Sequence, residues 1–288
     1  MLALLVVFLT TPARAQSPSP SNPRASMEQM LLPSHGSVLL GVFYLAGGAG
    51  PHPTAILLHG FPGYEQNLDL AQALRSKGWN VLALHYRGSW GVKGGFSFQH
   101  CIEDADTEVQ FILDPVNAKK YRIDPQHVFA IGHSMGGYMA ASAAAHNSRV
   151  AGAVLISAWN IGAGYENRRH AGVPESSLES EARSLGEGGN MAPLDGTTGM
   201  ALAEEIRAHA AELNMNNLAR AIAPRPVLVV TSGDGLAEAD HAFAVALKSA
   251  GDQQVSEAHF DTDHGYSDKR LELINAVANW LGSSPTKR

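Results

Sequence analysis

The feature that most constrains the fold of this 288-residue sequence is a repeated alternation of short apolar runs with helical patterns. Most of the short runs are apolar at successive positions, as in strands that are buried on both faces. This alternation is typical of strand–helix–strand units and predicts an α/β fold, a mostly parallel central sheet with helices on both faces. The predicted strands are 38–45, 55–59, 81–85, 128–131, 150–157, 226–231 and 255–260, and the predicted helices are 67–77, 103–113, 135–146, 201–213, 238–250 and 269–281.

The alternation breaks between about residues 159 and 223. Gly-rich and polar stretches at 186–190 and 193–199 surround helical patterns there. We interpret this segment as a small helical cap inserted into the sheet domain. Trp159 and Tyr165 are its candidate pocket walls, and a place in the core is the alternative for both.

The N-terminal region divides into three predicted parts. Residues 1–15 are predicted to be a signal peptide, because 2–9 form an apolar run of suitable length and 13–15 supply small residues for cleavage. We therefore expect a periplasmic or secreted protein. An uncleaved or lipid-anchored helix is the alternative, although this run is far shorter than the ~20 residues that span a bilayer. Residues 16–26 are predicted to form a Pro/Ser-rich leader, and residues 27–288 are predicted to form the α/β domain.

Composition narrows the class of partner. The net charge is −6, and no run of Lys or Arg suggests nucleic acid or an anionic membrane. No later segment looks transmembrane. The sequence also lacks a nucleotide-binding G-x-x-x-x-G-K-[ST] motif, an H-E-x-x-H motif and paired cysteines. We therefore expect a small-molecule substrate and no cofactor or metal. Cys101 is the only cysteine; a buried or helix-start position is the simpler interpretation, and a nucleophile the alternative.

The stretch 132–137, Gly-His-Ser-Met-Gly-Gly, carries the most specific chemical meaning. It matches G-x-S-x-G and lies directly between the predicted strand 128–131 and the predicted helix 135–146. The chain must turn sharply there, and a glycine two residues to either side of the serine lets neighbouring backbone approach closely. We therefore predict that Ser134 is a nucleophile. The alternative is a serine that only caps an ordinary helix.

At this point the sequence resembles the α/β-hydrolase superfamily, and over most of 27–281 it is similar to the dienelactone-hydrolase and dipeptidyl-peptidase-like branches. The resemblance implies an α/β-hydrolase fold with catalytic residues in the order Ser, acid, His. Three further stretches carry it: His-Gly-Phe-Pro-Gly at 59–63, Tyr-Arg-Gly-Ser at 86–89 with the glycine-rich residues up to 97, and Asp-His-Gly-Tyr-Ser-Asp at 263–268.

A serine hydroxyl is a poor nucleophile until a base takes its proton, and the base needs an orienting acid. His264 is the best candidate for the base, because it follows the last predicted strand at the sheet edge where α/β active sites collect. A solvated loop histidine is the alternative. Asp234 is the candidate acid just beyond strand 226–231. The family's acid usually comes a residue or so later, so Glu238 and Asp240 are alternatives, and Asp234 as a helix cap is another.

The tetrahedral intermediate of such a reaction needs donors for its oxyanion. The backbone N–H groups of Phe61 and Met135 are the predicted donors. The alternative for 59–63 is a strand-ending turn, and His59 is expected to brace this loop rather than to react. The stretch 91–95 lacks the helix start of a phosphate-binding loop and is predicted to be a flexible loop near the pocket.

The residues thus favour hydrolysis of a carboxylic ester through an acyl-enzyme on Ser134. The same machinery acting on an amide, as in an acylaminoacyl or dipeptidyl peptidase, is the alternative. Such peptidases commonly carry a large additional N-terminal domain, whereas only a short leader precedes the predicted sheet here. A binding protein on an inactivated hydrolase scaffold is the third possibility, because a fold alone does not establish activity.

Overall fold

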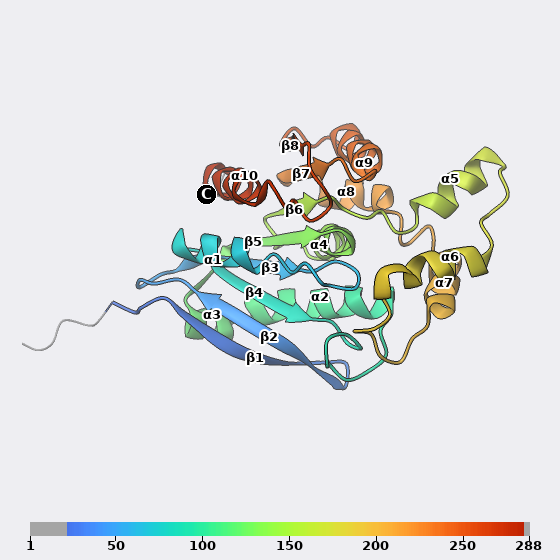
Figure 1. Ribbon diagram of the computed structural model, residues 1–288. Helices are drawn as coiled ribbons and strands as arrows, with labels where there is room; N and C mark the ends of the chain where they lie inside the picture. Colours follow the sequence, from blue (N-terminus) through green and yellow to red (C-terminus); the bar gives the residue numbers. More distant parts are fainter. Residues whose placement is uncertain (1–21, 285–288) are drawn as a thin grey trace, which may run out of the picture.

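Residues 22–284 are described by a computed structural model, shown in Figure 1. They form an eight-stranded sheet flanked by helices, so the predicted α/β architecture is confirmed. The predicted signal peptide, 1–15, and most of the predicted leader, 16–26, lie outside the described residues. None of the helices within 22–284 has both the length and the apolar character needed to cross a membrane.

The sheet has the strand order β1-β2-β4-β3-β5-β6-β7-β8. The β1–β2 and β2–β4 pairs are antiparallel, and every other neighbouring pair is parallel, which confirms a mostly parallel sheet. The central strands β3 to β7 are almost wholly buried because helices cover both of their faces. The strands are β1 (Ser26–Ser34), β2 (Ser37–Leu45), β3 (His52–Leu58), β4 (Asn80–His85), β5 (Ile123–His133), β6 (Gly152–Ile156), β7 (Val227–Ser232) and β8 (Val255–Phe260).

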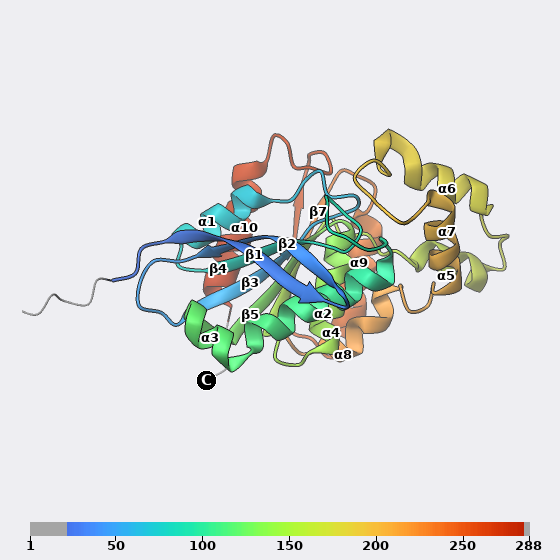
Figure 2. The ribbon, with the colours of Figure 1, turned by 90° about the horizontal axis from the view of Figure 1, so that it is seen from below.

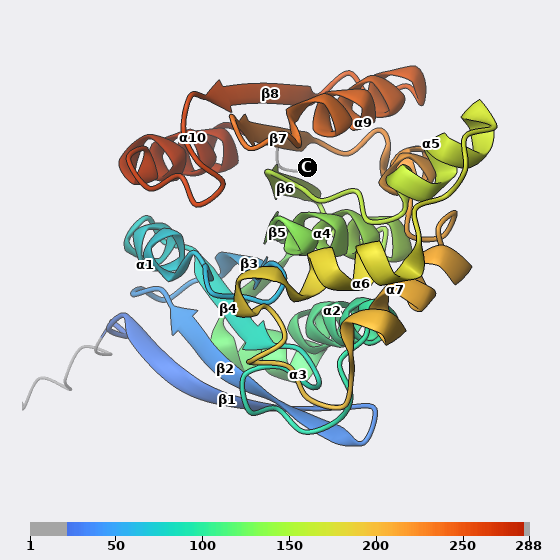
Figure 3. The ribbon, with the colours of Figure 1, turned by 45° about the vertical axis from the view of Figure 1, so that its right-hand side comes forward.

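Helices lie on both faces of the sheet, as Figure 3 shows. Each face has its own apolar cluster, and the one beneath α1 and α10 is the smaller of the two. Helices α1 (Leu68–Ser76) and α10 (Arg270–Ser283) cover one face, and α2 (Phe98–Leu113), α3 (Pro115–Tyr121), α4 (Met135–His146) and α9 (Ala237–Ser249) cover the other.

Helix α4 begins directly after Ser134 and lies against the middle of the sheet. Its sequence is rich in Ala and Gly, so the helix backbone approaches β5 and β6 closely and is buried on nearly all sides. A side chain on Gly136 would overlap the carbonyl group of Leu58, and one on Gly132 would overlap the backbone of Gly136. The predicted boundaries, 135–146, are confirmed.

The chain between β6 and β7 forms a cap, visible beside the sheet domain in Figure 2. The predicted helix 201–213 is shorter than expected, because it ends at Ala208 and continues as turns. The cap comprises α5 (Ala163–Ala171), α6 (Leu178–Gly186), the 3-10 turn η1 (Glu187–Gly189), α7 (Gly199–Ala208), the 3-10 turn η2 (Met215–Leu218) and α8 (Ala219–Ile222).

Other elements also differ from the prediction, among them β1, α2 and α3. Strand β1 is an edge strand that contains Pro33, a residue that weakens the strand pattern in a sequence but is tolerated at an edge. Helix α2 begins at Phe98 rather than at 103, because the Ser97 side chain accepts the N–H of His100. Helix α3 starts at Pro115 with Asp114 as its N-cap, a start signal that the sequence contains.

Candidate active site

Three of the predicted site residues follow strands β5, β7 and β8, all in the parallel part of the sheet. Ser134 comes directly after β5, Asp234 two residues after the end of β7, and His264 four residues after the end of β8. The carboxyl ends of parallel strands meet at one edge of the sheet, which is where open α/β sheets place their ligand sites. The strand order therefore brings these distant parts of the sequence together.

Ser134 occupies a strained turn between β5 and α4. Its backbone has φ 58° and ψ −124°, a region that residues other than glycine rarely adopt. The turn is held by hydrogen bonds from the Ser134 N–H to the Ile156 carbonyl, 2.9 Å, and from the Trp159 N–H to the Ser134 carbonyl, 2.9 Å. Strain of this kind persists only where surrounding structure enforces it, and it is common at functional sites.

The imidazole of His264 is bonded to a buried carboxylate. Its Nδ1 lies 2.7 Å from Oδ2 of Asp234, whose side chain is 5% exposed, whereas that of His264 is 42% exposed. This bond makes Nδ1–H the donor and leaves Nε2 free to accept a proton. The pair thus has the arrangement of a general base and its orienting acid.

Hydrogen bonds keep Asp234 ionised. Burial alone would raise the pKa of Asp234, but hydrogen bonds from His264, from the Leu236 N–H and from the hydroxyls of Ser157 and Ser232 outweigh it and lower that pKa. An ionised Asp234 stabilises the imidazolium that forms when a base at this position takes up a proton.

The two alternative acids lie elsewhere. Glu238 is in the first turn of α9 and is exposed to solvent. Asp240 is completely buried, and its Oδ2 accepts the backbone N–H of Ala158 at 3.0 Å. Burial raises the pKa of Asp240 to about 8. Of the three candidates, the structure brings Asp234 to His264.

Ser134 and His264 line one cavity of about 270 Å³. No hydrogen bond joins their side chains among residues 22–284; in ligand-free sites such contacts are often long and close on substrate binding. Most of the cavity wall comes from the 60–65 loop, together with Asn190 of the cap. The lining residues are Gly60, Phe61, Pro62, Gly63, Tyr64, Glu65, His133, Ser134, Asn190, His264 and Gly265.

The two predicted backbone donors flank Ser134. Phe61 lies on the cavity wall, and the neighbouring Gly60 is so close to the serine that a methyl group on it would lie 2.9 Å from the Ser134 Cβ. Met135 is the first residue of α4, where helix N–H groups lack intrahelical partners. In the described part of the chain, neither the Phe61 nor the Met135 N–H donates to a protein acceptor.

His59 braces the loop, as predicted. Its Nδ1 is bonded to the Gly60 carbonyl at 2.8 Å, and its Nε2 lies 3.3 Å from Nδ1 of His85. Burial, reinforced by His85, lowers the pKa of His59 to about 3, so this imidazole is neutral at pH 7.

His133 belongs to the site, although the sequence pattern did not single it out. Its ring packs on that of His264 with centroids 4.6 Å apart, and its Nε2–H donates to the His264 carbonyl at 2.8 Å. Burial and His264 lower the pKa of His133 to about 4, so the ring is neutral at pH 7. The available signal was its position next to the serine, at the end of a strand in the sheet centre. His133 fixes the backbone and ring of His264.

Two predictions about the pocket are wrong. Neither Trp159 nor Tyr165 lines the cavity: Trp159 packs on Phe61 and Phe98, and Tyr165 is buried in the cap. The stretch 91–95 lies near the pocket, and hydrogen bonds hold the surrounding loop to α2 and to the cap; its flexibility stays a prediction.

Two other groups of side chains bear on alternative chemistry. Cys101 is buried in α2, and burial raises the pKa of its thiol, which agrees with the simpler interpretation rather than with a nucleophile. Across residues 22–284, no three side chains of His, Cys, Asp or Glu gather in an arrangement that would hold a metal ion.

Residues 55–276 match the model of the Alpha/beta hydrolase family, so the chain belongs to that family. The predicted superfamily is therefore confirmed. No curated protein matches the sequence.

Solved structures share the fold at low identity. Est1E from Butyrivibrio proteoclasticus, solved with ferulic acid bound, is 17% identical with a TM-score of 0.69, over 90% of this chain and 100% of that one. EstE1, a thermostable carboxylesterase cloned from a metagenomic library, is 20% identical with a TM-score of 0.65, over 91% of this chain and 90% of that one. The acylaminoacyl peptidase of Pyrococcus horikoshii is 16% identical with a TM-score of 0.64, over 92% of this chain and 42% of that one.

These likenesses establish the fold, and they include a carboxylesterase and an acylaminoacyl peptidase. Family membership and esterase neighbours together support a hydrolase.

Proposed function

We propose that this protein is a serine hydrolase that cleaves carboxylic esters through an acyl-enzyme on Ser134. The observation that carries the proposal is the shared cavity: a serine on a strained strand-to-helix turn faces the same space as His264, whose Nδ1 lies 2.7 Å from a buried Asp234. A nucleophile, a base and an acid that orients the base are the parts that acyl transfer needs.

In the first half-reaction, Oγ of Ser134 attacks the ester carbonyl carbon while Nε2 of His264 takes the hydroxyl proton. The carbonyl π electrons move onto oxygen, and the N–H groups of Phe61 and Met135 stabilise that oxyanion. The intermediate collapses as the carbonyl re-forms and the bond to the leaving alcohol breaks. The imidazolium of His264 gives its proton to the departing alkoxide.

In the second half-reaction, water attacks the acyl group on Ser134 and gives a proton to His264. The second tetrahedral intermediate breaks to the free acid, and the same proton returns to Oγ of Ser134. Asp234 stays ionised throughout, in agreement with its lowered pKa.

Amide hydrolysis is the second candidate. The fold likeness to an acylaminoacyl peptidase favours it. An amine leaving group would take its proton from His264 in the same way, so the two candidates differ in substrate and not in the machinery.

The test is hydrolysis of short and long p-nitrophenyl esters and of an aminoacyl p-nitroanilide. Wild type, Ser134→Ala and Val116→Ala are compared; Val116 is 74% exposed on α3, distant in the fold from the sheet edge, and serves as a control. We expect ester cleavage by wild type and by the control, and none by Ser134→Ala. Faster anilide cleavage would establish the peptidase alternative. Absence of cleavage in wild type would favour a non-catalytic binding protein.

Export to the periplasm or medium is a separate proposal that rests on residues 1–15 alone. N-terminal sequencing of the protein recovered from the native host tests it. The expected first residue is Gln16, and a chain that retains Met1 would contradict it.

A further inference from the structure

A second cavity, of about 490 Å³, opens beside the one that contains Ser134 and shares Tyr64 as a wall. The proposed mechanism does not use it. We call it the rim groove, and define it by its lining residues: Tyr64, Trp90, Gly91, Ala192, Pro193, Leu194 and Asp195. Residues 192–195 of the cap form one side of the groove. Because the groove adjoins the catalytic cavity at Tyr64, it lies where a substrate would extend away from the reacting carbonyl.

Two aromatic rings form the part of the rim groove nearest the catalytic cavity. Tyr64 is 60% exposed and meets Trp90 edge to face, with ring centroids 5.4 Å apart. The indole N–H of Trp90 donates to the Pro62 carbonyl at 2.7 Å, and the Tyr64 hydroxyl donates to the Gly189 carbonyl at 3.2 Å. Because both donors are already used, the rings offer a ligand mainly their apolar surfaces.

The Asp and Glu side chains that line the two cavities carry negative charge, and no Lys or Arg lines either cavity. Asp195 lies on the wall of the rim groove, and Glu65, which pairs with Arg270 at 3.8 Å, lies on that of the catalytic cavity. Carboxylates accept hydrogen bonds and repel anions. The groove therefore favours a neutral ligand that carries O–H donors over one with a carboxylate or phosphate.

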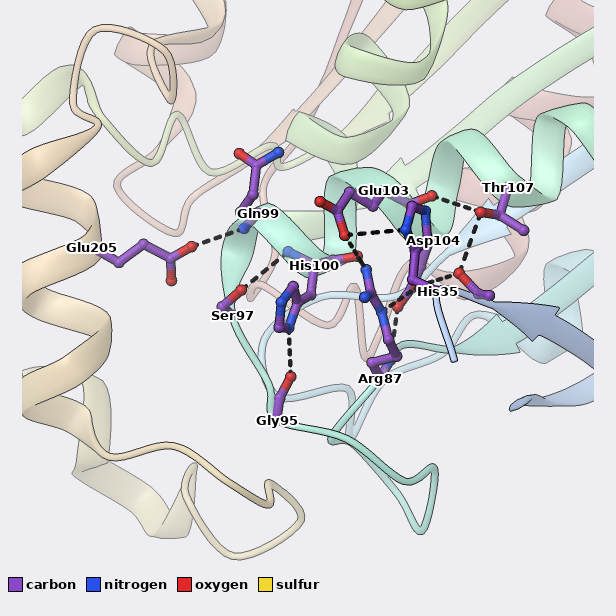
Figure 4. Close-up of polar contacts among 11 residues, drawn as sticks. His35, Arg87, Gly95, Ser97, Gln99, His100, Glu103, Asp104, Thr107 and Glu205 are labelled. Carbon is purple, nitrogen blue, oxygen red and sulfur yellow. Dashed lines mark hydrogen bonds and ion pairs between the residues drawn. The ribbon is translucent and has the colours of Figure 1, made fainter. Parts of the chain in front are cut away.

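Figure 4 shows how the loop that carries Trp90 is fixed at its base. The buried Arg87 donates to Asp104 at 2.8 Å and also pairs with Glu103, and His100 is bonded to the Gly95 carbonyl at 2.7 Å. Both ends of the loop are thus tied to helix α2.

The same loop pairs with the cap along the floor of the groove. The Trp90 N–H donates to the Pro193 carbonyl at 2.9 Å, and the Asp195 N–H donates to the Gly88 carbonyl at 2.8 Å. Since both walls are joined by backbone hydrogen bonds, the groove is formed before any ligand arrives, which lowers the entropy cost of binding.

We infer that the rim groove binds a neutral polyhydroxylated ring, such as a pyranose, beside the scissile ester, so that acylated carbohydrates are the substrate class. This inference rests on the proposed function. A sugar ring has a face of C–H groups that stacks on an exposed aromatic ring, and hydroxyls that donate to carboxylates. A bound sugar ring keeps part of its surface in water, which suits an open groove. An apolar aryl group binds better in an enclosed pocket that removes its surface from water.

The first test compares kcat/KM for a mono-O-acetyl methyl xylopyranoside with kcat/KM for ethyl acetate. Wild type is expected to prefer the acetylated sugar, and Tyr64→Ala to lower the ratio of the two values about tenfold. Tyr64→Phe keeps the ring and is expected to restore most of the ratio, and Val116→Ala to leave it unchanged. A ratio that Tyr64→Ala does not lower, or wild-type preference for a methyl hydroxycinnamate over the acetylated sugar, would overturn the inference.

The second test measures binding without turnover, by calorimetry of Ser134→Ala with the same acetylated xyloside. We expect saturable binding that weakens about tenfold when Tyr64→Ala is added, and no binding would overturn the inference. The two proposals fail separately. Ser134-dependent cleavage of ethyl acetate without sugar preference would remove only the inference, whereas a wild type inactive on every ester would remove the proposed function and leave xyloside binding as the test of the groove.

Discussion

The carboxyl edge of the sheet and the rim groove differ in how their residues are held. Ser134, Asp234 and His264 each come after a strand of the sheet, so the sheet itself fixes their backbones. The groove is built from Tyr64, Trp90 and the 192–195 segment, which belong to loops tied to one another by hydrogen bonds. This contrast indicates that the sheet positions the proposed catalytic residues, whereas the loops and the cap select the substrate that reaches them.

The largest expected effect is a loss of activity at the sheet edge. Asp234→Asn keeps the shape of the side chain but removes the charge that stabilises the imidazolium, so kcat/KM for a p-nitrophenyl ester should fall about 10³–10⁴-fold. Asp240→Asn is the matched control and should stay within about threefold of wild type. Equal losses in the two variants would show that Asp234 is not the orienting acid.

The next effect concerns stability, and it separates the sheet from the cap. Gly136→Ala would push a methyl group into the Leu58 carbonyl, so urea unfolding should show a loss of about 3 kcal/mol or more. In the cap, a methyl group on Gly164 of α5 meets no atom within 4 Å, and Gly164→Ala should change stability by at most about 1 kcal/mol. Comparable losses at both positions would remove the distinction.

A smaller effect is the pH dependence that Asp240 imposes. Its pKa is about 8 in the folded protein and 3.8 without burial, so the folded state binds more protons between these values and stability falls as pH rises from 4 to 8. Asp240→Asn carries no charge, and its Tm should fall less than that of wild type over this interval. At pH 8, the free energy of unfolding of Asp240→Asn should exceed that of wild type by about 1–3 kcal/mol. Parallel Tm profiles for the two proteins would contradict this account of Asp240.

The smallest effect tests the joint between cap and sheet domain. The Glu205 carboxylate of α7 accepts the backbone N–H groups of Phe98 and Gln99, at 3.0 and 2.8 Å, and so caps α2 from another element. Figure 4 shows the contact with Gln99. Glu205→Ala should cost about 1–2 kcal/mol in thermal unfolding. Glu205→Gln keeps an acceptor and should cost less, and a larger loss for Gln than for Ala would argue against capping.

The sequence predicted most accurately the features that depend on local pattern. The boundaries of α4 and the turn at Ser134 are examples, because G-x-S-x-G between a strand and a small-residue helix permits few conformations. The order of the strands then explains why Asp234 and His264 meet. The sequence left Asp240 open as an acid, because its burial inside α9 depends on packing against the chain at Ala158.

The features that the sequence did not predict depend on tertiary contacts. Strand β1 is stabilised by pairing with β2 rather than by its own pattern, and α5 is mostly polar, with Ala163 and Tyr165 as its buried residues. Trp159 was a plausible pocket wall by its position in the chain, yet it packs among Phe61 and Phe98. Tyr64 and Trp90 carry no motif, and only the folded loops bring them to the cavity.

The measurement that tests the central claim most directly is covalent labelling with a fluorophosphonate, followed by peptide mass spectrometry. A hydroxyl activated by His264 should displace fluoride and form one phosphonylated serine, so wild type should carry a single adduct on Ser134. Ser134→Ala should carry none, and His264→Ala should label far more slowly. An adduct on another residue, or equal labelling of wild type and Ser134→Ala, would contradict the assignment of Ser134 as the nucleophile.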